Sequence, residues 1–240
     1  MYDTQDGELA VKTERSDAEE PVKCAAVRLL VVDDHPMLLH GVAATLEREE
    51  GFTVCGTAAS AEEALDIALS LKPDVVITDL SFPGKGGLEL VKDLKTAAPE
   101  ILTIVFSMHD EMIFAERALR AGAMGYVMKS EAPEQLFDAL HAVLKGDLYV
   151  SPAVSTQILS AFASGDVTGG QSPVRNLSDR EFDVFQLIGG GKSTSQIASL
   201  LHLSPKTIES HKASIRRKLN IESSSDLMLF AMRWVEGQSE

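Results

Sequence analysis

The segment VVITDLSFPGKGG, residues 75–87, places one carboxylate at the end of an apolar run and just before a glycine-rich turn. The run is short and rich in β-branched residues, which is typical of a buried strand. A carboxylate beside such a strand is costly unless a partner pairs with it or a reaction uses it. Asp79 is therefore either a turn or cap residue or a functional group, and the rest of the chain decides between these interpretations.

Short apolar runs of the same kind recur on both sides of this segment. They are VRLLVV, FTVCGTA, DVVITD, ILTIVFS and GYVMK, and helical patterns separate them near residues 36–49, 60–71, 86–97, 110–121 and 133–145. Ser60 and Glu63 have the spacing of a capping box, and Pro133 suits a first helical turn. Strands that alternate with helices predict a doubly wound α/β domain with a parallel sheet over residues 27–148.

The flanking regions have a different character. Residues 1–26 are polar, acidic and aperiodic, which predicts a disordered tail. Residues 149–173 contain GDVTGGQSP and are expected to be a linker, within which VSTQILSAF is a candidate short helix.

Residues 174–238 contain no strand pattern. Three helix starts follow one another closely there, marked by Ser178 with Glu181, by Ser193 with Gln196, and by Ser204 before Pro205. A small all-helical domain is expected.

Composition excludes several classes of protein. The 240 residues are 45% hydrophobic, which is enough for two modest cores. No stretch is long and apolar enough for a membrane helix, and the first residues lack the pattern of a secretory signal, so we expect a cytoplasmic protein with no membrane association. Cys24 and Cys55 have no CxxC spacing, which indicates neither a zinc site nor a disulfide framework.

The net charge of −14 is unevenly distributed along the chain. Residues 27–151 carry 10 basic and 20 acidic side chains, whereas residues 176–240 carry 8 of each. Within residues 204–220, the only acidic side chain is Glu209, and it stands against five basic ones: Lys206, Lys212, Arg216, Arg217 and Lys218. One basic strip on a neutral module is a candidate surface for contacting DNA phosphates.

Polar residues gather at the strand ends of the predicted sheet. Asp33 and Asp34 end the first strand, Asp79 the third, Ser107 the fourth and Lys129 the fifth. The carboxyl ends of parallel strands meet at one edge, so these side chains are expected to converge. Three carboxylates there would repel one another unless a hard cation such as Mg²⁺ lies between them. A carboxylate beside Mg²⁺ can attack a phosphoryl group, while a lysine and a hydroxyl contact its oxygens, which makes Asp79 the candidate nucleophile.

These residues carry a family resemblance. DD at 33–34, DLSFPGKGG with Asp79, SMHD with Ser107 and GYVMK with Lys129 resemble, in order, the motifs of the response-regulator receiver domain over about residues 27–148. The resemblance implies a flavodoxin-like fold with Asp79 as the phosphorylated residue.

The same resemblance implies roles for further residues. Mg²⁺ would be bound by Asp34, Asp79 and the backbone carbonyl of Ser81, with Asp33 acting through water. Ser107 and Tyr126 would form a switch pair that responds to the phosphoryl group. From the residues alone, ordinary packing remains an alternative for Tyr126.

Two features suggest sites that the sequence does not support. GGGKST at 189–194 is similar to a phosphate-binding loop, but Gln186 stands where the motif needs glycine, so the glycines are interpreted as a helix end and turn. His35, His109 and His141 are scattered, and no histidine metal site is expected.

Residues 194–219 have the pattern of a helix-turn-helix. A short helix over 194–201 and a turn at 202–203 precede a longer basic helix over 205–219, whose apolar side carries Ile208, Ile215 and Leu219. A helical hairpin with a solvated basic face is the alternative.

The stretch NLSDREFDVFQLIGGGKSTSQIASLLHLSPKTIESHKASIRRKLNI resembles the DNA-binding domain of LuxR-type regulators, over about residues 174–238. Together the two halves are similar to the NarL/FixJ class of response regulators. The resemblance implies base contacts by Glu209, Ser210 and Ala213, and phosphate contacts by Lys206, Thr207, Lys212, Arg216 and Arg217. Some members of the class carry a basic residue at the position of Glu209. Glu209 could instead accept a hydrogen bond from cytosine N4.

The last helix, SSDLMLFAMRWV, is more apolar than a three-helix core requires. In the resembling family this helix pairs two DNA-bound domains, so a homodimer on two-fold related double-stranded DNA is expected. Alternatively, Leu227, Phe230 and Trp234 only complete the core.

The sequence therefore predicts a phosphorylation-dependent transcription regulator. A sensor histidine kinase or phosphorelay protein would phosphorylate Asp79, and the chain would be an acceptor, not an enzyme. A phosphohydrolase similar to the haloacid dehalogenases would need a second acid at position 81, where Ser81 stands. A receiver that never accepts phosphate and serves as a protein-interaction platform is the remaining alternative.

Overall fold

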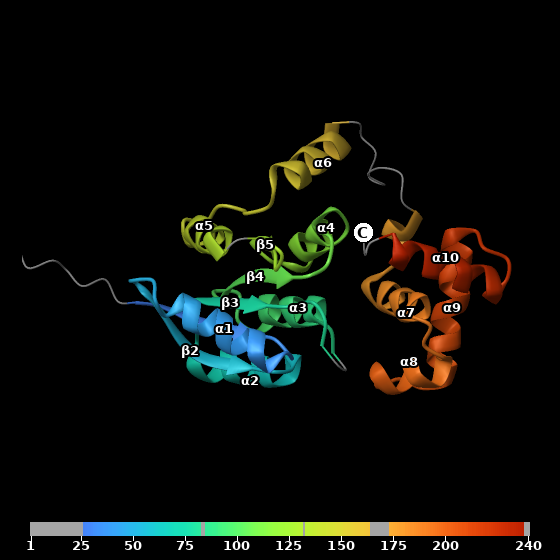
Figure 1. Ribbon diagram of the computed structural model, residues 1–240, viewed down its shortest axis with the longest axis horizontal. Coiled ribbons are helices and arrows are strands. Elements are labelled where there is room, and N and C mark those ends of the chain that lie inside the picture. Colours follow the sequence, from blue (N-terminus) through green and yellow to red (C-terminus); the bar gives the residue numbers. More distant parts are fainter. Residues whose placement is uncertain (1–25, 83–84, 132, 164–172, 238–240) are drawn as a thin grey trace, which may run out of the picture.

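The computed structural model describes residues 26–82, 85–131, 133–163 and 173–237. The predicted acidic tail lies outside these residues, apart from its last one, as does the GDVTGG part of the predicted linker. Figure 1 shows a sheet layered between helices and, beside it, a separate group of helices. We call β1 to α5 the α/β domain and η1 to α10 the helical domain.

The sheet of the α/β domain has five parallel strands in the order β2-β1-β3-β4-β5. The strands are β1 (Val27–Val32), β2 (Phe52–Ala58), β3 (Val75–Thr78), β4 (Leu102–Ser107) and β5 (Gly125–Met128). β1 and β3 lie inside the sheet, and their side chains from Leu29 to Val32 and from Val75 to Thr78 are all buried. The predicted doubly wound fold is confirmed.

Five helices cover both faces of this sheet. They are α1 (Pro36–Leu46), α2 (Ala61–Leu71), α3 (Gly87–Ala97), α4 (Glu111–Ala121) and α5 (Pro133–Leu144). Alternate residues of the inner strands pack to opposite sides: Leu29 and Val31 meet α1 and α5, whereas Leu30 and Val32 meet α2 and α3. α4 covers the same face as α2 and α3, beside β5.

The predicted linker contains the helix α6 (Pro152–Ala163), which packs on α4. Val154 is fully buried, and the Gln157 side chain donates to the carbonyl of Met112 at 3.2 Å. The Ser151 hydroxyl donates to Glu111 at 2.6 Å. The candidate helix is present, and its apolar side makes it an added layer of the α/β domain.

The helical domain consists of η1 (Pro173–Asn176), α7 (Asp179–Gly189), α8 (Thr194–Leu200), α9 (Pro205–Leu219) and α10 (Ser224–Glu236). Ser178 and Ser193 form complete capping boxes, and Ser204 caps α9 by accepting from the amide of Thr207. Gly191 has φ +72°, so the glycine run ends α7 and turns the chain toward α8.

Aromatic contacts form the core of the helical domain. The Trp234 ring lies 5.3 Å from that of Phe182 and 5.5 Å from that of Phe185, and Phe230 lies 5.9 Å from Phe185. Leu227 is fully buried. Leu227, Phe230 and Trp234 thus pack inward, as the alternative of core packing expects, while the neighbouring Met228 and Leu229 are 43% and 55% exposed.

Glu181 ties the start of α7 to α9. It is 6% exposed and accepts from the Ser214 hydroxyl and the Lys218 ammonium, each at 2.6 Å, and from the amide of Ser178 at 2.7 Å. Burial alone would raise the pKa of Glu181, but these hydrogen bonds from Lys218, Ser214 and Ser178 outweigh it and lower the pKa to about 2.

Glu181→Gln is expected to lower the free energy of unfolding of the helical domain by about 1–2 kcal/mol at pH 7, because it removes charge-assisted bonds. A carboxylate with a lowered pKa stabilises the fold above its unfolded pKa and loses that effect as pH falls through the folded value. The difference should therefore disappear between pH 4.5 and about 2. Urea unfolding of both proteins across pH, with Glu222→Gln as a surface control, measures it; a constant difference would contradict the prediction.

Contacts also join the two domains. The Arg117 side chain of α4 donates to the carbonyls of Leu177 at 2.8 Å and Val174 at 3.0 Å, and its guanidinium lies 4.7 Å from the centre of the Phe182 ring. Asp179 accepts from Arg117 at 3.2 Å and from Lys92 of α3 at 2.5 Å. The start of the helical domain is thus docked on α3 and α4. Within the described residues, none of the helices is long and apolar enough to span a membrane.

Candidate functional site

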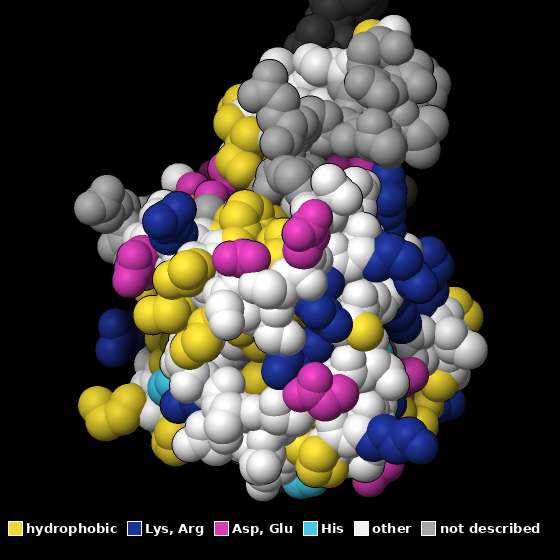
Figure 2. All heavy atoms as spheres, turned by 90° about the vertical axis from the view of Figure 1, so that its right-hand side faces the viewer, with side chains coloured by type: hydrophobic (Ala, Val, Ile, Leu, Met, Phe, Trp, Pro, Cys, Tyr) yellow, Lys and Arg dark blue, Asp and Glu magenta, His cyan; other side chains and the backbone are white. Residues whose placement is uncertain are grey.

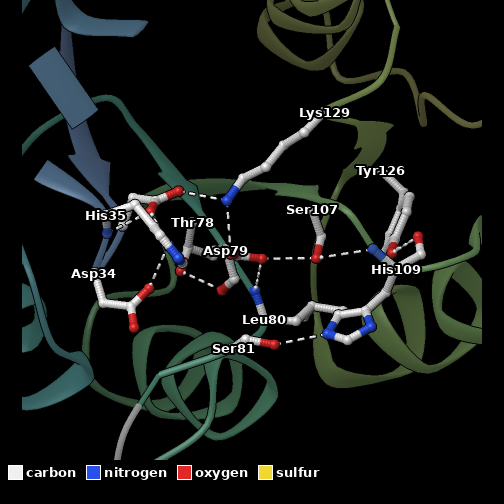
Figure 3. A network of polar contacts seen from close by, with 11 residues as sticks. Asp34, His35, Thr78, Asp79, Leu80, Ser81, Ser107, His109, Tyr126 and Lys129 are labelled. Atoms are coloured by element: carbon white, nitrogen blue, oxygen red, sulfur yellow. Dashed lines mark hydrogen bonds and ion pairs between the residues drawn. The ribbon is translucent and has the colours of Figure 1, made fainter. Parts of the chain in front are cut away.

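The polar strand ends of the α/β domain meet at the carboxyl edge of the sheet, as Figure 3 shows. Asp33 follows β1, Asp79 follows β3, Ser107 ends β4 and Lys129 follows β5. Asp33 and Asp79 are only 4% and 5% exposed. The parallel arrangement therefore brings together four groups from distant parts of the chain.

Both carboxylate oxygens of Asp79 accept hydrogen bonds. Oδ1 accepts from the Ser107 hydroxyl and from the amide of Leu80, each at 2.6 Å, and Oδ2 accepts from the Lys129 ammonium at 2.6 Å. These donors fix the orientation of the carboxylate at the edge of the sheet. A carboxylate held in this way is suited to attack an electrophile that approaches from the loops at the carboxyl edge of the sheet.

Lys129 joins two buried acids. Its ammonium contacts Asp33 Oδ2 as well as Asp79, and its side chain is 4% exposed. One cation between two carboxylates leaves a net negative charge, and Asp34 adds a further carboxylate next to it. The site is therefore an acidic pocket with one fixed cation.

Donor atoms suited to a hard cation lie at this pocket. Asp33, Asp34 and His35 offer ligand atoms within 4.8 Å of one another. Asp34 Oδ1 is shielded from solvent and accepts no hydrogen bond from the described residues, although His35 Nδ1 lies 2.9 Å away. A shielded carboxylate oxygen without a donor fits Mg²⁺, which prefers oxygen ligands. His35 belongs to this group because it directly follows Asp34, although no histidine was expected at a metal site.

The predicted Mg²⁺ ligands are not all gathered in that group. Asp79 is connected to Asp33 through Lys129 and does not belong to the three-residue set. The Ser81 side chain contacts His109 Nε2 at 2.6 Å. The roles of Asp79 and of the Ser81 carbonyl toward a metal remain predictions.

Tyr126 lies with its ring inside the domain, 1% exposed. Its hydroxyl donates to the carbonyl of His109 at 2.8 Å. Burial, followed by the negative charge of Asp79, raises the pKa of Tyr126 far above its usual value, so the hydroxyl stays a neutral donor. Ser107 and Tyr126 thus both contact the backbone of His109, in the segment that joins β4 to α4: the Ser107 hydroxyl accepts from its amide at 3.4 Å, and the Tyr126 hydroxyl donates to its carbonyl.

His109 is a site residue that the sequence did not single out. Its ring stacks on Phe114 with centroids 4.6 Å apart, and Phe114 meets Phe182 of α7 edge-on at 4.9 Å. Burial is the main cause of the lowered pKa of His109, so the ring is neutral near pH 7. Its place in the SMHD motif could be seen in the sequence, but its stacking on Phe114, which in turn meets Phe182, depends on tertiary structure.

A second candidate surface lies on α9. Lys and Arg side chains gather on the part of the helical domain that points away from the α/β domain (Figure 2). Of the predicted DNA contacts, Thr207, Lys212 and Arg216 are half-buried, and the others are exposed: Lys206, Glu209, Ser210, Ala213 and Arg217.

Some of these side chains have partners within the domain. The Glu209 carboxylate accepts from Lys212 at 2.9 Å and from the Thr194 hydroxyl at 2.8 Å, and these bonds lower its pKa. Arg216 donates to the carbonyl of Glu222 at 3.1 Å. Glu209 must leave these partners, or share them, before it can accept a hydrogen bond from a base.

Known protein families match both halves of the chain. The response regulator receiver domain model matches residues 29–141, and the model of bacterial regulatory proteins of the luxR family matches residues 175–231. Response regulator GacA of Pseudomonas aeruginosa is 36% identical over 207 residues, which cover 86% of this chain and 96% of that protein. Oxygen regulatory protein NreC of Staphylococcus carnosus is 33% identical and is covered to 97%.

Solved structures of response regulators also match both halves of the chain. RcsB of Salmonella enterica serovar Typhimurium, bound to promoter rprA in the presence of the phosphomimetic BeF3-, is 30% identical with a TM-score of 0.63. The match covers 86% of this chain and 98% of that one. A second structure of RcsB from Salmonella typhimurium, described as showing conformational dynamism for DNA interaction, has a TM-score of 0.67 at 29% identity.

Proposed function

The chain belongs to the NarL/FixJ class of response regulators, in which a receiver domain is joined to a LuxR-type DNA-binding domain, and we propose that phosphoryl transfer to Asp79 controls its binding to promoter DNA. One observation carries this proposal. The Asp79 carboxylate is held at the carboxyl edge of the sheet by Ser107, the Leu80 amide and Lys129.

The geometry suits one reaction. An Asp79 oxygen attacks phosphorus, a P–O bond forms, and the P–N bond to the histidine of a kinase or phosphorelay protein breaks, with its electron pair staying on the imidazole. Asp33, Asp34, Asp79 and the Ser81 carbonyl would hold Mg²⁺, which neutralises phosphoryl oxygens when bound. Lys129 and Ser107 already donate hydrogen bonds to the Asp79 carboxylate. Once Asp79 is phosphorylated, they would donate to the phosphoryl oxygens instead.

That exchange of partners connects the site to the rest of the domain. The Ser107 and Tyr126 hydroxyls both bind the backbone of His109, in the segment before α4, and the His109 ring packs on Phe114. When Ser107 turns to a phosphoryl oxygen, this segment must adjust. Because Phe114 contacts α7, the adjustment reaches the DNA-binding domain.

The DNA-binding half would read double-stranded DNA through α9. Glu209, Ser210 and Ala213 lie on its exposed side and would meet base edges. Five further residues of the helix would contact phosphates: Lys206, Thr207, Lys212, Arg216 and Arg217. The exposed Met228 and Leu229 of α10 offer an apolar surface for a homodimer on a two-fold related site. Such a regulator acts in the cytoplasm as an acceptor and not as an enzyme.

Binding of the full chain to a library of promoter fragments tests the proposal. With Mg²⁺, the phosphoryl mimic beryllofluoride should tighten binding by about tenfold, the usual range of a coupling free energy. Asp79→Asn should abolish this response, because the mimic needs the Asp79 oxygen. Asp66→Asn, an exposed carboxylate on α2, is the matched control and should respond as the wild type does.

Equal binding of all proteins with and without beryllofluoride would overturn the proposal. The receiver would then be a protein-interaction platform that leaves DNA affinity to other partners.

A further inference from the structure

A cavity of about 390 Å³ lies between the receiver and the DNA-binding domain. On the receiver side it is lined by Asp34, Ser81 and His109, the residues that surround the phosphoacceptor site where Figure 3 shows Asp79. Side chains of α7 and α8 line the other side. The cavity therefore opens onto the rim of the phosphoacceptor site, and the DNA-binding domain supplies part of its wall.

The lining of this cavity is acidic. Four carboxylates line it, namely Asp34, Glu89, Asp179 and Asp183, and among the described residues no lysine or arginine does. Two of the four are accounted for: Asp34 belongs to the acidic pocket at the site, and Asp179 is paired with Lys92 and Arg117. The other two are Glu89 of α3 and Asp183 of α7, and Asp183 forms an ion pair with Arg180 of its own helix at 3.6 Å.

Asp183 faces the receiver. A Cβ built on Gly86, in the loop before α3, would lie 3.9 Å from its Oδ2. Its ion-pair partner Arg180 lies on the same helix, so Asp183→Asn would leave this guanidinium, and with it a positive charge, beside the cavity. Burial, with smaller effects of Glu89 and Asp179, raises the pKa of Asp183 to about 6 despite Arg180. At pH 7.5 the carboxylate is ionised.

We propose that Asp183 of the DNA-binding domain, together with Glu89, is a specificity-determining residue for phosphoryl transfer, because its negative charge disfavours small anionic phosphodonors at the acceptor site. The inference rests on the proposed function of Asp79. Small acyl phosphates such as acetyl phosphate carry about two negative charges near neutral pH, so like charges along their route lower their local concentration and rate of encounter. The effect is electrostatic and must weaken as salt shortens the screening length.

Faster modification of Asp183→Asn would not be explained by a weaker contact between the two domains. The substitution removes a like-charge repulsion between Asp183 and Glu89 across the domain boundary. It leaves the contacts of Arg117, Lys92 and Phe182 in place. The docked arrangement should be at least as stable in the variant, so faster modification would report the field and not a released domain.

The test is the rate at which acetyl phosphate modifies the full chain at pH 7.5, with saturating Mg²⁺ and low salt, measured by intact mass. Asp183→Asn should react about threefold faster than the wild type, and the two rates should converge at about 1 M salt, where the screening length is a few ångström. Asp183→Glu restores the charge and should restore the slow rate. Glu222→Gln, an exposed acid of the same domain away from this cavity, should match the wild type.

Two results would overturn the inference: equal rates for Asp183→Asn and the wild type at low salt, or a faster variant whose advantage persists at high salt. Failure of the proposed function looks different. In that case Asp79→Asn would be modified as the wild type is, or no protein would be modified at all.

Discussion

Lys129→Met should lower the free energy of unfolding of the receiver domain by about 3–5 kcal/mol at pH 7 in the absence of Mg²⁺. The Lys129 ammonium lies between Asp33 and Asp79, and all three side chains are almost completely buried. Methionine matches the length of the lysine stem but brings no charge. The substitution therefore leaves two buried carboxylates that repel each other and have lost their shared donor, which is the costly way to break a buried ion pair.

Magnesium provides the second half of this prediction. If the acidic pocket binds Mg²⁺, the ion supplies positive charge where Lys129 removed it, so millimolar Mg²⁺ should stabilise the variant more than the wild type. Urea unfolding with and without Mg²⁺ measures both effects. Lys145→Met, an exposed lysine after α5, is the control and should change stability by less than about 0.5 kcal/mol. An unfolding midpoint of Lys129→Met equal to that of the wild type would show that the buried ion pairs do not stabilise the fold.

Regular sequence patterns predicted the strand ends, the helix starts and the edge of the sheet at which the site lies. Strand ends could be located because a buried parallel strand is a continuous apolar run, and the parallel order then brings Asp33, Asp79, Ser107 and Lys129 to one edge. Helix starts could be located from serine caps with Glu or Gln three residues later, as at Ser178 and Ser193.

Contacts between distant segments could not be predicted in this way. Arg117 and Asp179 are 62 residues apart, and neither stands in a pattern that identifies its partner. Glu181 was recognised as part of a capping box, but its bond to Lys218 depends on how α7 crosses α9. His109 is similar: its position after β4 was clear, whereas its contact with Phe114 depends on the packing of α4. The mode of docking between the domains therefore emerges only from the structure.

Gly87→Ala should lower the free energy of unfolding by at least about 3 kcal/mol, although alanine is the better helix former by about 1 kcal/mol and Gly87 is the first residue of α3. A Cβ at this position would lie 2.0 Å from the carbonyl oxygen of Asp79 and 2.7 Å from the Cα of Leu80. Both are backbone atoms, which cannot turn aside as a side chain does. The clash must move either α3 or the backbone that carries Asp79, and overpacking of this kind is strongly destabilising.

Gly86→Ala is the matched control, one residue earlier in the same loop. Its Cβ would meet nothing closer than 3.8 Å, and its φ of −72° suits any residue. Urea unfolding should therefore separate the two variants by several kcal/mol, and the rate of modification by acetyl phosphate should fall in Gly87→Ala, because the displaced atoms belong to Asp79 and Leu80. Similar stabilities of the two variants would contradict the prediction, because they would mean that α3 shifts away from Asp79 at little cost. The close approach of α3 to the acceptor backbone would then not be required by the fold.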